Sequence, residues 1–174
     1  MKRKQKPKTN KRLDSQMNAK IKSYLKAEAI VAAAFNFFIN GMIAALIYHK
    51  ADRVTTDTVS IAIDLVTTCF LTFTITALFC RASVRRTKTA GALKIGSRIV
   101  NFLSKLFVRP VLFGALAGIF AAFVLFTLTA PLFAVLGIST LPFGVYVALK
   151  CVFTSLLGGG VTAFELYLGM VAAG

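Results

Sequence analysis

The feature that most constrains this chain is an apolar run at residues 59–80 that carries a single carboxylate, Asp64. The run is long enough to cross a lipid bilayer as one helix. Its polar residues then fall on one side of that helix: Ser60, Asp64, Thr67, Thr68, Thr72 and Thr74. An isolated charge in hydrocarbon is costly, so we expect this side to face protein or a water-filled cavity.

Three further apolar runs of similar length occur at residues 27–48, 111–136 and 143–170. The chain is 57% hydrophobic and has a mean hydropathy of +0.75, which is too high for a soluble domain of 174 residues. The sequence therefore predicts an all-α fold, a four-helix transmembrane bundle, with residues 27–174 as one transmembrane domain.

The formal net charge of +15 comes from 21 lysine and arginine residues against 6 acidic ones, and most basic residues lie in two blocks. The first block, residues 1–26, is predicted to be a tail, disordered over residues 1–13, that ends in an interfacial turn beside anionic lipid headgroups. No aromatic residues are interleaved with the basic run at residues 1–13, so nucleic acid is not an expected partner. The positive-inside bias places both blocks and both termini in the cytoplasm, in a multi-pass protein of the plasma membrane.

The second basic block, residues 81–109, is expected to begin as a loop over residues 81–91. Toward its end, apolar residues recur at helical spacing: Ile95, Ile99, Leu103 and Leu106. The basic residues of the same segment fall largely on another stripe. This pattern predicts an amphipathic helix that lies in the membrane surface between the second and third spans.

Small residues four positions apart predict close packing between membrane helices. They occur in the first and third spans as Gly41, Ala45, Gly114, Gly118 and Ala122. The fourth span contains three successive glycines at residues 158–160, which fit a hinge and a close helix contact equally well.

Lys150, in the fourth span, lies at nearly the same depth from the outer membrane surface as Asp64, so we expect the two to pair. The depth of two asparagines in the first span extends this pair to a cluster of Asn36, Asn40, Asp64, Thr68 and Lys150. The cluster is interpreted either as a substrate- or ion-binding site or as a structural pair that fixes which helices are neighbours. A third interpretation is that Lys150 extends to the membrane surface on its own.

A shift of 86 residues aligns Asp64 with Lys150 and superimposes several identical residues of the second and fourth spans. These are Val66, Thr68, Leu71, Thr76 and Ala77, which fall on Val152, Thr154, Leu157, Thr162 and Ala163. Chance similarity between two apolar helices and a parallel internal repeat both account for the match.

Three segments of the first half resemble those of small four-span bacterial inner-membrane proteins of unknown function. They are Glu28…Asn36-Phe-Phe-Ile-Asn40-Gly41, Ser60-Ile-Ala-Ile-Asp64 and Arg81…Arg85-Arg86. The resemblance implies a bacterial origin and a role for the asparagine and aspartate positions, and it implies no particular activity.

Sequence motifs for catalysis are lacking. The chain has no phosphate-binding loop, dinucleotide fingerprint or zinc-protease motif, and its single histidine, His49, falls in a loop. The three cysteines match no zinc or redox spacing, so neither an enzyme nor a metal or cofactor is expected. Glu28 and Glu165, near the cytoplasmic ends of their spans, are expected at wet interfacial positions.

The leading hypothesis from the sequence is a small channel or transporter-like protein for a small solute or ion. The alternative is a non-transporting subunit or scaffold of a larger membrane complex. Because four helices enclose little volume, we expect a homodimer or a larger complex in either case.

Overall fold

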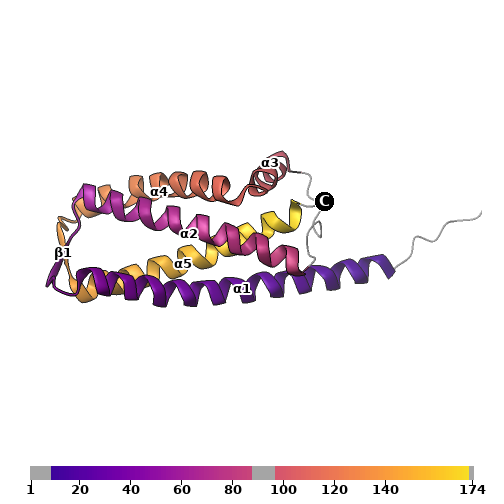
Figure 1. The fold of residues 1–174 in the computed structure, drawn as a ribbon, viewed down its shortest axis with the longest axis horizontal. Helices are drawn as coiled ribbons and strands as arrows, with labels where there is room; N and C mark the ends of the chain where they lie inside the picture. The colour runs from indigo at the N-terminus through magenta and orange to yellow at the C-terminus, as the bar shows by residue number, and fades with distance from the viewer. Residues whose placement is uncertain (1–8, 88–96, 173–174) are drawn as a thin grey trace, which may run out of the picture.

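The computed structural model describes residues 9–87 and 97–172, which form five helices and two short strands (Figure 1). In chain order these are α1 (Thr9–Tyr48), β1 (Arg53–Thr55), α2 (Thr58–Thr87), α3 (Arg98–Phe107), α4 (Pro110–Val135), β2 (Thr140–Pro142) and α5 (Phe143–Val171). The helical fold class is confirmed for this part of the chain, and the strand pair is an addition that the sequence did not predict.

Four of the helices, α1, α2, α4 and α5, are long and apolar enough to cross a membrane. Their most apolar stretches have mean hydropathies of 2.1, 1.9, 2.5 and 1.6, in that order. They coincide with the four predicted spans, so the chain has the helices of a multi-pass membrane protein.

Two predicted irregular segments are helical. Helix α1 begins at Thr9 and continues without a break into the first span, so the disorder predicted for residues 9–13 is wrong. Helix α2 continues to Thr87, so the loop predicted for residues 81–87 is wrong. Both extensions grow from an existing helix and so need no new nucleation, which favours continuation through lysine- and arginine-rich sequence. Residues 1–8 and 88–96 lie outside the described residues.

The amphipathic segment is present as helix α3. Leu103 and Leu106 pack against an apolar core that contains Phe107 and Phe113, whereas Ile99 is 72% exposed. Ile95, the first residue of the predicted stripe, lies outside the described residues. The location of α3 in a membrane surface stays a prediction.

Helices α2 and α5 are neighbours in the middle of the bundle, with α1 packed along α5 and α4 packed along α2 (Figure 1). Hydrogen bonds between α2 and α5 join residues 82 and 86 positions apart, which shows that these two helices run parallel and nearly in register. The chain forms two helical hairpins, α1–α2 and α4–α5. The first helix of each hairpin therefore packs on the second helix of the other hairpin. This exchange is the arrangement that a parallel repeat related by a two-fold axis along the bundle would produce.

The strand pair closes one end of the bundle, which we call the strand end. β1 and β2 pair antiparallel, with Val54 opposite Leu141. The ladder continues on both sides, because the Thr56 N–H donates to the Ser139 carbonyl at 2.9 Å and the Phe143 N–H donates to the Asp52 carbonyl at 3.0 Å. The two loops between spans are thus joined by main-chain hydrogen bonds.

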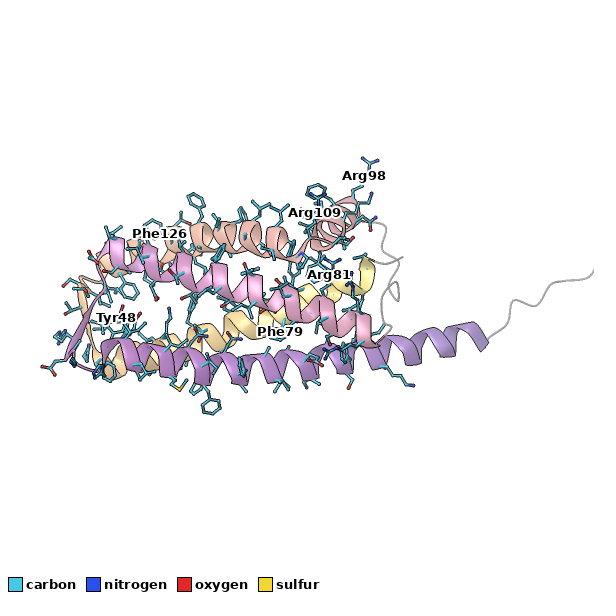
Figure 2. The ribbon with its side chains drawn as sticks, viewed as in Figure 1. Tyr48, Phe79, Arg81, Arg98, Arg109 and Phe126 are labelled. Atoms are coloured by element: carbon cyan, nitrogen blue, oxygen red, sulfur yellow. The ribbon has the colours of Figure 1, made fainter. Side chains whose placement is uncertain are left out.

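The opposite end, which we call the α3 end, carries basic side chains. Arg81, Arg98 and Arg109 lie there, whereas Tyr48 and Phe126 lie toward the strand end (Figure 2). The N-terminal part of α1 also extends past this end (Figure 1). The described parts of both basic blocks therefore lie at one end of the molecule, and the side of the membrane that it faces stays a prediction.

Asp57 marks the start of α2. The Ser60 N–H donates to Asp57 Oδ1 at 3.0 Å, as in a helix N-cap. Hydrogen bonding from Ser60 lowers the pKa of this exposed carboxyl. The interaction is local and lies outside the span.

The predicted small-residue positions lie at helix contacts. A methyl group at Gly114 would lie 2.5 Å from the Thr74 Cα, so α4 approaches the backbone of α2 directly. Ala122, farther along α4, is 1% exposed. On α1, Gly41 is buried against Cys151 of α5, and Ala45 is half-buried beside it.

The three successive glycines of α5 serve different neighbours. A methyl group at Gly158 would overlap the Asn36 amide, and one at Gly159 would lie 3.1 Å from the Ala29 carbonyl oxygen of α1. Nothing lies within 4 Å of such a group at Gly160. Helix α5 is unbroken through the run, so close packing rather than a hinge accounts for the first two glycines.

Alanine at Gly158 is therefore expected to destabilise the fold by about 2 kcal/mol, because it overpacks the contact with α1. Alanine at Gly160 is the matched control and is expected to be neutral or slightly stabilising, since alanine favours helix. Denaturant unfolding of both variants in mild detergent measures the difference. Equal stabilities would show that α1 adjusts to the added methyl group.

Candidate functional site

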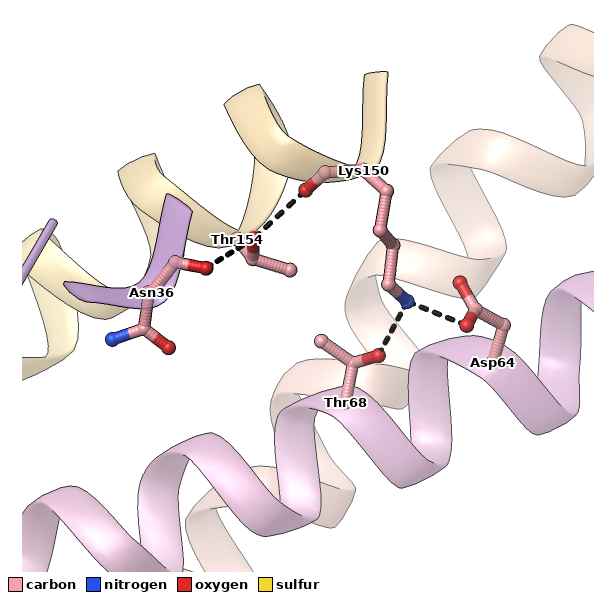
Figure 3. Close-up of polar contacts among 5 residues, drawn as sticks. All are labelled: Asn36, Asp64, Thr68, Lys150 and Thr154. Atoms are coloured by element: carbon pink, nitrogen blue, oxygen red, sulfur yellow. Dashed lines mark hydrogen bonds and ion pairs between the residues drawn. The ribbon is translucent and has the colours of Figure 1, made fainter. Parts of the chain in front are cut away.

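An ion pair inside the membrane-length helices forms the candidate site. Lys150 Nζ of α5 lies 2.5 Å from Asp64 Oδ1 of α2 and donates a second hydrogen bond to Thr68 Oγ1 at 2.6 Å (Figure 3). Asp64 and Thr68 are one helical turn apart, so they present their oxygens on the same face of α2. The pair expected from the depths of Asp64 and Lys150 is present.

The two members of the pair differ in accessibility. The Lys150 side chain is 9% exposed, which contradicts the interpretation that it extends away on its own, whereas the Asp64 side chain is 35% exposed. Asp64 lies about 9 Å and Lys150 about 11 Å from the starts of their helices at the strand end. The ammonium is therefore enclosed by protein, and the carboxylate retains an open side.

The two asparagines do not join the pair. Asn40 Nδ2 donates to Asn36 Oδ1 at 3.2 Å, and Asn36 Nδ2 donates to the Ala32 carbonyl at 2.9 Å. Asn36 packs against Gly158 of α5, but its hydrogen bond to α5 is made by its main-chain oxygen, which accepts from Thr154 Oγ1 at 3.3 Å (Figure 3). The structure thus brings Asp64, Thr68 and Lys150 together and leaves the asparagine amides bonded within α1, as short polar side chains often are in helices.

Buried threonines continue from the ion pair along α2 and α5. They are Thr68 and Thr72 on α2, and Thr154 and Thr162 on α5. Thr154 Oγ1 donates to the Lys150 carbonyl at 2.8 Å, and Thr162 Oγ1 donates to the Gly158 carbonyl at 2.7 Å. These bonds satisfy the hydroxyl donors and leave oxygen lone pairs as acceptors along the centre of the bundle.

Glu165 is a residue that sequence reasoning misplaced. Its side chain is fully buried and neither carboxylate oxygen has a hydrogen-bond partner among the described residues. The predicted wet interfacial position is wrong, because α3 and the extended α1 cover this end of α5. The sequence did indicate that Glu165 faces the bundle. It continues the α5 stripe formed by Lys150, Thr154, Gly158 and Thr162, at spacings of three and four.

A cavity of about 720 Å³ lies away from the pair. Apolar residues of α4 and α5, among them Leu116 and Phe164, line it, with Phe73 of α2. Neither Asp64 nor Lys150 borders it. Because no polar groups converge there, the ion pair and not this cavity is the candidate site.

Comparison with known proteins identified no relative of this chain. No model of a protein family, no curated protein and no solved structure matched the chain. Within residues 9–87 and 97–172, no three histidine, cysteine or acidic residues are grouped to hold a metal ion. The resemblance to four-span bacterial proteins stays a prediction.

Proposed function

We propose that this protein is a small channel or transporter-like membrane protein that binds an ion or small solute at the Asp64–Lys150 pair. The supporting observation is a carboxylate within a membrane-length helix that is paired and still 35% exposed. Ionisable residues within membrane spans commonly mark ion or substrate pathways.

Binding at this site works by exchange of partners. A proton or small cation that reaches Asp64 from its open side replaces the Lys150 ammonium as the partner of the carboxylate. Thr68 continues to accept a hydrogen bond from Lys150 and so reduces the cost of the exchange. Because the carboxylate is the accessible member, a cationic ligand is favoured over an anionic one. The transporting unit is expected to be a homodimer or a larger complex.

Removal of both charges is expected to abolish flux without loss of the fold. The variant Asp64→Asn/Lys150→Met leaves no unpaired charge, so the protein still assembles but lacks its exchangeable site. Purified protein is reconstituted in liposomes, and proton and sodium entry are followed with entrapped fluorescent indicators. Less than about one tenth of the wild-type rate is expected, a loss of at least about 1.4 kcal/mol in transition-state terms.

The matched control is Asp57→Asn, which removes an exposed carboxylate at the start of the same helix and is expected to leave flux unchanged. Wild-type flux in the double variant would assign the pair a structural role.

A second candidate is a non-transporting subunit or scaffold. The observation that favours it is that the Lys150 ammonium already has two hydrogen-bond partners and its side chain is only 9% exposed. A pair that fixes neighbouring helices has these properties. This function predicts no flux in wild-type liposomes. It also predicts partner proteins that co-purify in mild detergent and are lost when the basic residues between 81 and 105 are neutralised.

A further inference from the structure

A second carboxyl lies at the other end of the central helix. Glu165 follows Lys150 by 15 residues of α5, which is about 22 Å along the helix axis. The two acidic groups, Asp64 and Glu165, therefore lie near opposite ends of the bundle. They differ in environment, because Asp64 has a lysine and an open side, and Glu165 has neither hydrogen-bond partners among the described residues nor exposure.

Two titratable side chains from neighbouring helices face the same region. Glu165 and Glu28 of α1 both lie in the neighbourhood of the Cys80 thiol of α2. The thiol donates to the Thr162 carbonyl at 3.8 Å, so it does not serve the Glu165 carboxyl. The contacts of Gly41 with Cys151 and of Gly159 with Ala33 place Glu28 at about the level of Glu165 in the antiparallel α1–α5 pair.

Among the described residues, α3, α4 and Arg81 of α2 supply no counter-charge. Helix α4 contains no ionisable residue, and the basic residues of α3, Arg98 and Lys105, are exposed. Arg81 of α2 donates to the Val108 carbonyl at the turn between α3 and α4. No salt bridge to Glu165 is found among the described residues.

These surroundings define the class of ligand. A carboxylate without partners is strongly disfavoured away from water, so the group must bind something positive. Calcium-like cations require about six oxygen ligands, and the Cys80 thiol and the apolar core at this end of the bundle do not supply them. A proton needs a single carboxylate oxygen.

We propose that Glu165 is a proton-binding site, occupied by a proton when the α3 end is closed as in this structure. The proton bonds to one carboxylate oxygen and returns to water when that end opens. The assignment does not depend on whether the Asp64–Lys150 pair supports flux.

Helix α3 forms the cover of this site. A methyl group at Gly169 of α5 would lie 3.2 Å from a ring carbon of Phe107 and 2.9 Å from a methyl group of Val84, so the end of α5 is tightly enclosed. Phe107 also stacks edge-to-face on Phe113 of α4, with ring centroids 5.4 Å apart. We therefore expect exchange of the proton with water to follow displacement of Phe107.

Infrared spectroscopy of the full-length protein in liposomes at neutral pH tests the assignment. The carbonyl stretch of a protonated carboxyl is expected in the wild type and in the control Glu28→Gln, and it is expected to be lost in Glu165→Gln. Identical wild-type and Glu165→Gln spectra would overturn the proposal. If Glu165→Gln does not fold, Glu165→Asp provides the reading: a shifted band supports the site, and an unchanged band removes it.

The cover is tested by transfer of the same samples to heavy water. The isotope shift of the Glu165 band is expected to develop several-fold faster in Phe107→Ala than in the wild type, because the smaller side chain exposes the end of α5. Equal exchange rates would show that α3 does not enclose the site.

Discussion

Asparagine in place of Asp64 is expected to destabilise the folded protein by about 3 kcal/mol, since removal of one member of a buried pair leaves the other charge without compensation. The charge left behind is the Lys150 ammonium, which is 9% exposed. Lys150→Met is expected to cost less, because the remaining Asp64 carboxylate is 35% exposed and so is less enclosed by protein than the ammonium. Denaturant unfolding in mild detergent, followed by circular dichroism, measures both changes.

The double variant Asp64→Asn/Lys150→Met is expected to recover most of the stability lost in Asp64→Asn. This non-additivity is the coupling energy of the pair, which a double-mutant cycle isolates. A double variant as unstable as the sum of the two single variants would show that the charges do not interact. Together with the flux measurement, the cycle separates a transport site from a structural pair. If the pair is a transport site, the double variant regains stability but lacks flux. If the pair is structural, the double variant regains stability and its flux is unchanged.

Leucine at Gly118 is expected to have an effect of similar size, about 3 kcal/mol, on the packing of α4 against α2. A methyl group there would lie 2.8 Å from both the Cys69 carbonyl oxygen and the Phe70 Cα. These are backbone atoms that no rotamer change moves, so the two helices must separate along their contact.

The control for this substitution is Gly144→Leu, on α5, where nothing lies within 4 Å of an added methyl group. Thermal unfolding in the same detergent compares the two variants. A Gly118→Leu protein as stable as Gly144→Leu would mean that α4 and α2 do not depend on close contact.

The spans and the ion pair were predictable because both follow from position along a single axis. Hydropathy locates each crossing, and the depth of Asp64 and Lys150 follows from counting residues from the ends of their helices. Neither inference needs the rotation of a helix or its neighbours. The hydrogen bonds between α2 and α5 join residues 82 and 86 positions apart, close to the sequence shift of 86.

The errors arose where rotation and tertiary cover decide. Asn36 lies at a suitable depth, but α1 packs on α5 with the Asn36 amide against Gly158, away from Lys150. The α5 stripe gives the direction in which Glu165 points, but its burial also depends on α3 and on the helical extension of α1, which lie outside α5. The pairing of β1 with β2 depends on two distant loops that meet only after the helices have assembled.

The pairing of β1 with β2 limits how the two helical hairpins, α1–α2 and α4–α5, can move relative to each other. Its central residue, Val54, is 3% exposed, and Arg53 Nε adds a hydrogen bond to Thr140 Oγ1 at 2.9 Å across the ladder. A relative motion of the hairpins that preserves these bonds is a rotation about the strand pair. The displacement that it produces grows with distance from the strand pair along the bundle. The hairpins therefore separate most at the α3 end, where Glu165 is enclosed. The surroundings of Asp64, close to the strand pair, change least.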